Sequence, residues 1–130
     1  METAVIIDFG GQYTQLIARR IRSLNVFSQV LPYTVSLQEI LALSPGGIIL
    51  SGGPASVTDP GAPSCDPDLF RQGIPVLGIC YGMQLMGHLL GGRVAAASRR
   101  EYGLVTVEAD RRRALFRDFE ENNTCWMSHT

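Results

Sequence analysis

The sequence predicts a doubly wound α/β fold, in which helices cover both faces of a mostly parallel sheet. Short apolar runs that suit buried strands alternate with segments whose apolar residues recur at helical spacing. Towards the end of the chain, strand-like segments follow one another with no helix between them, which predicts an antiparallel extension at one edge of the sheet. A chain of 130 residues suits one domain of this kind.

The first strand and the first helix are predicted from the opening of the chain. An almost continuous apolar run over 4–9 indicates a buried strand, and Gly10-Gly11 indicates the turn that ends it. A helix over 13–24 follows, and its arginines lie largely off an apolar stripe that we expect to face the core. This stripe consists of Leu16, Ile17, Ile21 and Leu24.

A second strand over 26–33 and a third over 47–50 are separated by a short helix. Ser36 and Glu39 have the spacing of a capping box, in which the serine caps the helix and the glutamate lies three residues later. We expect this helix to end at about Leu43.

The later part of the alternation starts with a loop rich in proline, serine, aspartate and glycine over 55–67. A short helix at 68–72 and a fourth strand at 74–79 follow, and a longer helix over 81–90 comes after them. Further strands are predicted at 93–97, 104–108 and 124–128.

Composition and charge exclude several classes of protein. The formal net charge of −1 offers no general attraction to nucleic acid or to an anionic membrane surface. No apolar run approaches the roughly 18 residues that a membrane-spanning helix needs. The three cysteines, Cys65, Cys80 and Cys125, form no CxxC pair, which argues against a zinc site or a disulfide framework. We therefore expect a cytoplasmic protein that binds no metal.

The strongest chemical signal lies in the segment 75–84. A buried strand leads into Cys80, a helix begins directly after it, and Gly78 and Gly82 lie two residues to either side. This is the pattern of a nucleophile elbow, a tight turn that leaves room only for small flanking residues. The start of the following helix favours the thiolate form of Cys80. An ordinary buried cysteine is the alternative, but the strand–turn–helix context favours a nucleophile.

A second signal is the segment 50–54, Leu-Ser-Gly-Gly-Pro, at the end of the preceding strand. Loops at the carboxyl ends of neighbouring parallel strands meet in one crevice. The backbone N–H groups of Gly52-Gly53 are therefore candidates for an oxyanion hole beside Cys80. A plain glycine turn is the alternative.

Together these motifs resemble the class I (triad) glutamine amidotransferases. The elbow at 78–84 and the turn at 50–54 carry the likeness to the class. The segments 8–22, 100–103 and 126–129 resemble the GMP synthase branch of it. The likeness spans essentially the whole chain, and its motifs occur in the expected order.

The resemblance implies a flavodoxin-like fold and a glutaminase reaction. Cys80 would attack the side-chain carboxamide of glutamine, release ammonia and form a glutamyl thioester that water hydrolyses. The backbone N–H groups of Gly53 and Tyr81 would form the oxyanion hole. The resemblance also implies a set of substrate-binding residues, namely Gly52, Gln84, Ser128 and His129.

The same resemblance implies a partner for the released ammonia. In the GMP synthase branch, an ATP pyrophosphatase domain uses ammonia to convert adenylated XMP to GMP. ATP and Mg²⁺ belong to that synthetase domain, so no cofactor is implied for this chain. Glutamine as substrate and the synthetase domain are the expected partners, with no nucleic acid and no membrane.

One part of the family pattern has no counterpart here. The triad histidine and glutamate of the family lie in a His-Pro-Glu motif, which this sequence does not contain. His88 lies eight residues after Cys80, about 12 Å along a helix, and is predicted to be a surface or packing residue. We interpret residues 1–130 as an incomplete amidotransferase domain and expect no useful glutaminase activity from it alone.

Two functional alternatives remain open. One is a class I amidotransferase that serves another acceptor, as in anthranilate or carbamoyl phosphate synthesis. The other is a catalytically inactive fragment that only binds a partner.

Lesser features have structural explanations: Asp8 closes the first strand or caps the next helix, and Asp66 and Asp68 are loop and helix-start residues. Arg111-Arg112-Arg113 is interpreted as a solvated turn or as a contact with a partner domain.

Overall fold

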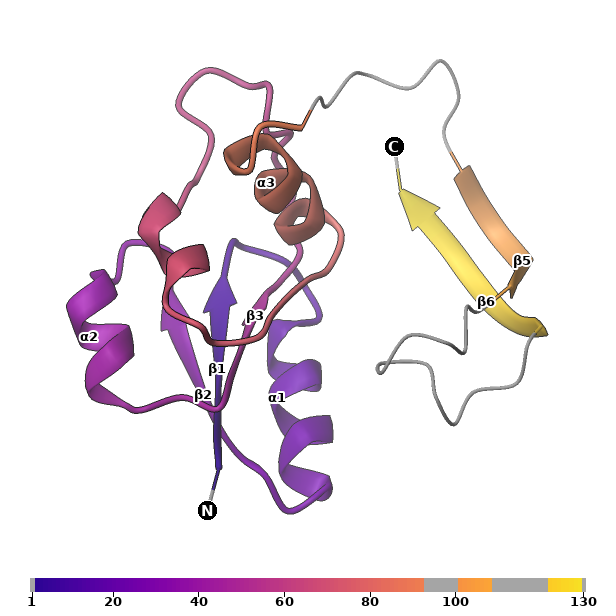
Figure 1. Cartoon of the computed structure of the whole chain (residues 1–130). Helices are drawn as coiled ribbons and strands as arrows, with labels where there is room; N and C mark the ends of the chain where they lie inside the picture. The colour runs from indigo at the N-terminus through magenta and orange to yellow at the C-terminus, as the bar shows by residue number, and fades with distance from the viewer. Residues whose placement is uncertain (1, 93–100, 109–121, 130) are drawn as a thin grey trace. The chain divides into compact units, whose positions relative to one another are not determined.

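The computed structural model describes residues 2–92, 101–108 and 122–129 (Figure 1). The chain divides into two units, Met1–Ala95 and Ala96–Thr130, and each is described by itself. Within the described ranges, none of the helices combines the length and the apolar character that crossing a bilayer requires.

Unit 1 is built on a four-stranded parallel sheet with strand order β2-β1-β3-β4. β1 pairs with both β2 and β3, and β3 pairs with β4, all in parallel. The direction of travel across the sheet reverses after β2, so right-handed crossovers place helices on opposite faces. The strands are β1 (Thr3–Asp8), β2 (Phe27–Pro32), β3 (Gly47–Leu50) and β4 (Val76–Gly78).

Helices occupy the connections between these strands, and one further helix follows β4. Figure 1 shows α1 on one side of the sheet and α2 on the other, which confirms the predicted doubly wound, flavodoxin-like architecture. The helices are α1 (Thr14–Ser23), α2 (Leu37–Ala42), the 3-10 helix η1 (Pro67–Arg71) and α3 (Tyr81–Leu89).

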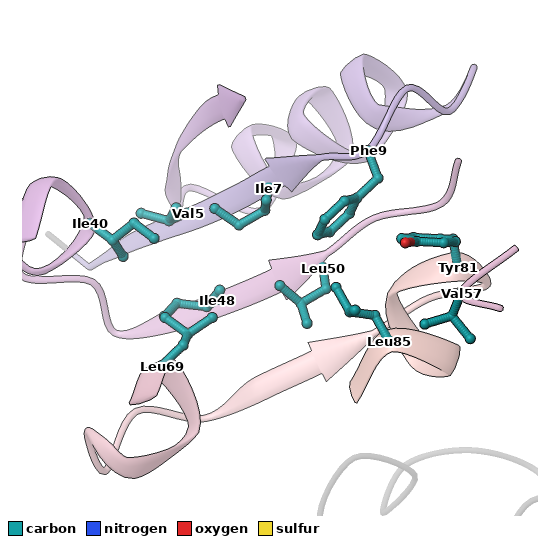
Figure 2. Close-up of a cluster of buried hydrophobic side chains, with 10 residues drawn as sticks. All are labelled: Val5, Ile7, Phe9, Ile40, Ile48, Leu50, Val57, Leu69, Tyr81 and Leu85. Carbon is teal, nitrogen blue, oxygen red and sulfur yellow. The ribbon is translucent and has the colours of Figure 1, made fainter. Parts of the chain in front are cut away.

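The main core lies on one face of the sheet, where alternate strand residues point. Val5 and Ile7 are at most 1% exposed and face this core, together with Ile48 and Leu50 of β3. Figure 2 shows their side chains meeting those of α2, η1 and α3. The cluster comprises Val5, Ile7, Phe9, Ile40, Ile48, Leu50, Val57, Leu69, Tyr81 and Leu85.

The buried face of α1 differs from the predicted apolar stripe. Leu16 and Leu24 are 42% and 73% exposed, whereas Thr14 and Ala18 are buried. Small side chains let the helix lie close to β2, where the hydroxyl of Ser28 donates a hydrogen bond of 2.9 Å to the carbonyl of Ala18. The stripe prediction was therefore wrong for these two leucines, because close backbone packing outweighed side-chain hydrophobicity. Ile17 and Ile21 are half-buried.

The sequence predicted the start of α2 correctly. Its predictions of the type of η1 and the length of β4 were less accurate. Ser36 caps α2, and its hydroxyl accepts a hydrogen bond of 3.1 Å from the amide of Glu39, as the capping box predicted. The helix expected at 68–72 is a 3-10 helix, capped by the carboxylate of Asp66. β4 has three residues, so the strand expected over 74–79 is shorter than predicted.

Unit 2 contains one antiparallel pair of strands, β5 (Glu101–Glu108) and β6 (Asn122–His129). The register pairs Glu101 with His129. The late antiparallel strands were predicted, and their bounds are wider than the expected 104–108 and 124–128. They were expected as an extension at the edge of the parallel sheet, whereas β5 and β6 form a two-stranded sheet of their own. The strand predicted at 93–97 and the arginine turn at 111–113 lie outside the described residues.

Candidate active site

Cys80 lies at the turn between β4 and α3, as the elbow pattern predicted. It is the N-cap residue of α3, its side chain is exposed, and it belongs to neither element. Its backbone has φ 53° and ψ −114°, in a region that residues with a side chain rarely adopt. Such strain persists only where surrounding packing enforces it, and it is frequent at functional positions.

The packing that enforces this turn involves the two flanking glycines. A Cβ atom added at Gly82 would lie 2.0 Å from the carbonyl oxygen of Leu50, and one added at Gly78 would lie 2.7 Å from Cα of Met83. Both contacts are far inside van der Waals distance, so only glycine fits at either position. The elbow is therefore compressed between α3 and the end of β3.

The Gly52-Gly53 turn lies directly beside Cys80. A Cβ atom at Gly52 would lie 3.4 Å from the Cβ atom of Cys80. On its other side, the backbone of the Gly52-Gly53 turn packs directly against the backbone of the turn that follows β1. A Cβ atom at Gly53 would lie 2.3 Å from the carbonyl oxygen of Phe9, and one at Gly11 would lie 2.5 Å from that of Gly52. The carboxyl ends of β1, β3 and β4 thus converge on one point.

Hydrogen bonds hold the elbow to the end of β3. The amide of Ile79 donates to the carbonyl of Leu50 at 2.9 Å, and the amide of Gly82 donates to that of Ser51 at 3.1 Å. Because these bonds lie on both sides of Cys80, its backbone is fixed relative to the Gly52-Gly53 turn.

Tyr81 follows Cys80 and anchors the start of α3. Its side chain is buried, its ring centroid lies 5.3 Å from that of Phe9, and its hydroxyl donates a hydrogen bond to the carbonyl of Pro63. Burial raises the pKa of the Tyr81 hydroxyl, and the charge of Asp59 adds to this effect. Tyr81 therefore ties the 55–67 loop to the elbow through its side chain, while its backbone amide begins the helix.

The backbone amides beside Cys80 differ in whether they donate hydrogen bonds to backbone carbonyls. Those of Met83 and Gln84 donate to the carbonyl of Cys80, at 3.0 and 3.2 Å. Those of Gly53 and Tyr81 donate to no backbone carbonyl of the described residues. The first amides of a helix lack partners within it, which makes them suitable donors to an anion.

The remaining predicted residues fall in different places. Gln84 lies in the first turns of α3 and is half-buried, and His88 lies on the same helix with its side chain exposed, as predicted. Ser128 and His129 lie on β6 of unit 2, opposite Tyr102 and Glu101. Within unit 1, the structure brings the Gly52-Gly53 turn after β3 together with Cys80 and Tyr81 at the start of α3.

Asp8 and the remaining cysteines have structural settings. The carboxylate of Asp8 accepts a 2.7 Å hydrogen bond from the amide of Gly10, so it closes the turn after β1 rather than capping α1. Cys65 is half-buried and packs against the main core cluster. It also lines a small apolar hollow with Tyr33 and Leu69, away from the elbow. Cys125 lies on β6.

The two thiols of unit 1 are expected to differ in reactivity. Burial, and secondarily the charge of Asp66, raises the pKa of Cys65 to about 11. Only the thiolate reacts with iodoacetamide, so at pH 8 Cys65 should react at least about tenfold more slowly than exposed Cys80. Its rate should climb as the pH rises towards 11.

Peptide mapping after trypsin measures both rates, because cleavage at Arg71 and Arg93 separates Cys65 from Cys80. In urea at pH 8 the two cysteines should react at similar rates, which serves as the control. Equal reactivity of Cys65 in the folded and the unfolded chain at pH 8 would contradict its buried placement.

Two buried hydroxyl residues beside the elbow were not predicted from the sequence. Thr14 at the start of α1 and Ser51 at the end of β3 are 3% and 0% exposed, and their side-chain oxygens lie 3.1 Å apart. Thr14 precedes buried Ala18 by one helical turn, which was the available signal. Among the described residues, no group of three histidine, cysteine, aspartate or glutamate side chains is placed to hold a metal ion.

Comparison with known proteins identifies relatives of this chain among the glutamine amidotransferases. Residues 5–130 match the family described as glutamine amidotransferase class-I. The chain is 59% identical over 129 residues to a glutamine-hydrolysing GMP synthase of Ruminiclostridium cellulolyticum. This match covers 99% of this chain and 25% of that protein. It is 55% identical over 125 residues to the GMP synthase of Synechocystis sp., covering 96% of this chain and 23% of that protein. The chain thus spans about a quarter of the length of these curated relatives.

A solved structure is similar over the whole chain. The crystal structure described as that of a GMP synthase subunit from Thermoplasma acidophilum superimposes with a TM-score of 0.83 at 26% identity. The match covers 99% of this chain and 65% of that one. The parallel sheet, the elbow at Cys80 and the family match agree, and the chain therefore belongs to the class-I glutamine amidotransferases.

Proposed function

We propose that this chain is the glutaminase portion of a GMP synthase and that Cys80 is the nucleophile with which the whole enzyme hydrolyses the side-chain amide of glutamine. The observation that carries the proposal is the exposed Cys80 in its strained turn, with the Gly52-Gly53 turn in contact range. The GMP synthase relatives favour a role in GMP synthesis over a role in anthranilate or carbamoyl phosphate synthesis.

The first step forms a bond between Sγ of Cys80 and the amide carbon of glutamine. Cys80 is exposed at the start of α3, and its thiolate is the attacking species. Negative charge develops on the former carbonyl oxygen. The amides of Gly53 and Tyr81 are free of backbone acceptors among the described residues, and we assign them to the oxyanion hole.

Collapse of this intermediate breaks the carbon–nitrogen bond, and ammonia leaves with the proton that the thiol of Cys80 lost when the thiolate formed. Water then attacks the glutamyl thioester, which releases glutamate and returns the thiol. We assign Gly52 and Gln84 of unit 1 to the wall of the glutamine site. Ser128 and His129 of unit 2 are assigned to the amino-acid end of the substrate, on the family resemblance alone.

The acceptor of the ammonia belongs to the remainder of the protein in the relatives. We assign the amination of adenylated XMP, with its ATP and Mg²⁺, to an ATP pyrophosphatase domain. The described residues hold no acidic cluster for Mg²⁺, and the sequence has no phosphate-loop motif, so these groups do not fit this chain. The three cysteines form no CxxC pair and no even-numbered disulfide framework, which supports a reducing, cytoplasmic location.

Covalent labelling by the diazoketone analogue of glutamine tests the proposal. The analogue should alkylate Cys80, found in the tryptic peptide 72–93, and leave Cys65 unmodified. Glutamine should slow the labelling in a concentration-dependent manner, whereas asparagine, one methylene shorter, should not. A Cys80→Ala variant is the control for labelling elsewhere.

Two results would count against the glutaminase assignment. One is equal labelling of Cys65 and Cys80, which would show that the analogue reacts as a general alkylating agent. The other is labelling of Cys80 that glutamine does not slow. That second outcome would favour the alternative of an inactive binding fragment.

A further inference from the structure

Ser51 connects three elements at the carboxyl edge of the sheet. Its amide and its hydroxyl both donate to the carbonyl of Ile7 in β1, at 3.1 and 2.7 Å. Its own carbonyl accepts from the amide of Gly82 in α3, at 3.1 Å. The next residue in the chain is Gly52, which lies against Cys80. Any displacement of Ser51 is therefore transmitted both to the glycine turn and to the elbow.

The direction of the hydrogen bond between Thr14 and Ser51 follows from counting protons. The hydroxyl of Ser51 has a single proton, and the 2.7 Å contact with the carbonyl of Ile7 uses it. The Ser51 oxygen must then accept the proton of the Thr14 hydroxyl, 3.1 Å away. The other contacts of that hydroxyl, with Asp8 at 3.4 Å and Gly11 at 3.5 Å, are longer. A relay thus runs from Thr14 through Ser51 to Ile7.

The relay lies out of reach of solvent. Thr14 is 3% and Ser51 0% exposed, so water cannot replace a missing partner at either hydroxyl. Removing the Thr14 hydroxyl would leave one acceptor site of the Ser51 oxygen unpaired in a buried position. Ser51 would then be free to shift, and the Gly52-Gly53 turn would shift with it.

We propose that Thr14 and Ser51 are positioning residues, which hold the Gly52-Gly53 turn against the elbow so that the Gly53 amide faces the developing oxyanion. This inference rests on the glutaminase function proposed above. Neither residue touches the substrate in the proposed reaction. Their effect is exerted through the turn and through the bond from Ser51 to Gly82.

The Thr14→Val variant tests this role, because valine keeps the shape of threonine and lacks the hydroxyl. We expect labelling of Cys80 by the diazoketone analogue to fall about tenfold, since that probe has a carbonyl oxygen that the oxyanion hole must orient. Iodoacetamide needs no such orientation, so its reaction with Cys80 should change by less than about twofold. Thr14→Ser retains the hydroxyl and should restore labelling to within about twofold of the original chain.

Matched controls separate positioning from a general loss of structure. Thr34→Val makes the same change at an exposed position and should alter neither rate. Hydrogen exchange of the Ser51 and Gly82 amides should accelerate in Thr14→Val, while that of Ile40 in α2 should not. This second readout requires no glutaminase chemistry.

The outcomes distinguish the two proposals. Failure of the original chain to label at Cys80 overturns the proposed function, and the exchange data then decide the positioning role alone. Unchanged labelling and exchange in Thr14→Val overturn the positioning role while the function stands. Equal acceleration at Ser51, Gly82 and Ile40 also overturns it, because the hydroxyl would then support the whole fold and not this turn.

Discussion

Replacing Gly82 with alanine is expected to lower the stability of the fold by about 3 kcal/mol, at the upper end for an overpacked core. The new Cβ atom would lie 2.0 Å from the carbonyl oxygen and 2.7 Å from the Cβ atom of Leu50, which is fully buried in β3. None of these atoms belongs to a flexible side-chain end, so α3 must move away from the sheet. That movement breaks the hydrogen bond from Gly82 to Ser51 and opens the elbow.

Thermal and urea unfolding measure this effect. For a chain of this size, about 3 kcal/mol corresponds to a decrease of roughly 10 °C in the melting temperature. Gly87→Ala is the matched control in the same helix, because a Cβ atom there meets nothing within 4 Å. That change should stabilise the protein by about 0.5–1 kcal/mol, since alanine favours the helix. A Gly82→Ala variant as stable as the original chain would show that α3 is not pressed against Leu50.

The second large effect is expected in catalysis by the isolated 130-residue chain. Its sequence holds two histidines, of which His88 is exposed on α3 and His129 ends β6. About 12 Å of helix separates His88 from Cys80, so it cannot take the thiol proton. Positioned general acid–base catalysis contributes about 10²- to 10⁴-fold. We therefore expect ammonia release from glutamine at no more than about 0.1 s⁻¹, which is about 10²-fold below the median enzyme turnover of about 10 s⁻¹.

A coupled ammonia assay tests this expectation, with Cys80→Ala as the background. Added imidazole should raise the rate of the original chain and leave Cys80→Ala unchanged, because a dissolved base can substitute in part for a missing side chain. Ammonia release at several turnovers per second without any addition would contradict the expectation. It would mean that a residue of this chain already serves as the base.

The sequence determined the order and the type of the elements with good accuracy. The apolar runs predicted β1 to β4, and the Ser36–Glu39 spacing predicted the cap of α2. These signals are local, since periodicity and capping depend on residues within one or two turns of each other. The elbow at Cys80 was predictable for the same reason, because its glycines lie two positions away on either side.

The errors occurred where the outcome depended on distant parts of the chain. Leu16 and Leu24 have the hydrophobicity of core residues, yet α1 buries Thr14 and Ala18. Small residues allow the helix to approach β2, and nothing within α1 itself reveals which neighbour it will meet. η1 and β4 were also shaped by their surroundings more than by their own composition.

The sequence alone therefore determined that a cysteine follows a buried strand, starts a helix and is flanked by glycines. Only the tertiary structure decided that this cysteine lies beside the Gly52-Gly53 turn, because that contact joins residues nearly thirty positions apart. The same holds for the bond between Thr14 and Ser51, which links α1 to β3. A local sequence pattern determines local conformation. The close approach of two backbone segments depends on how whole helices and strands pack.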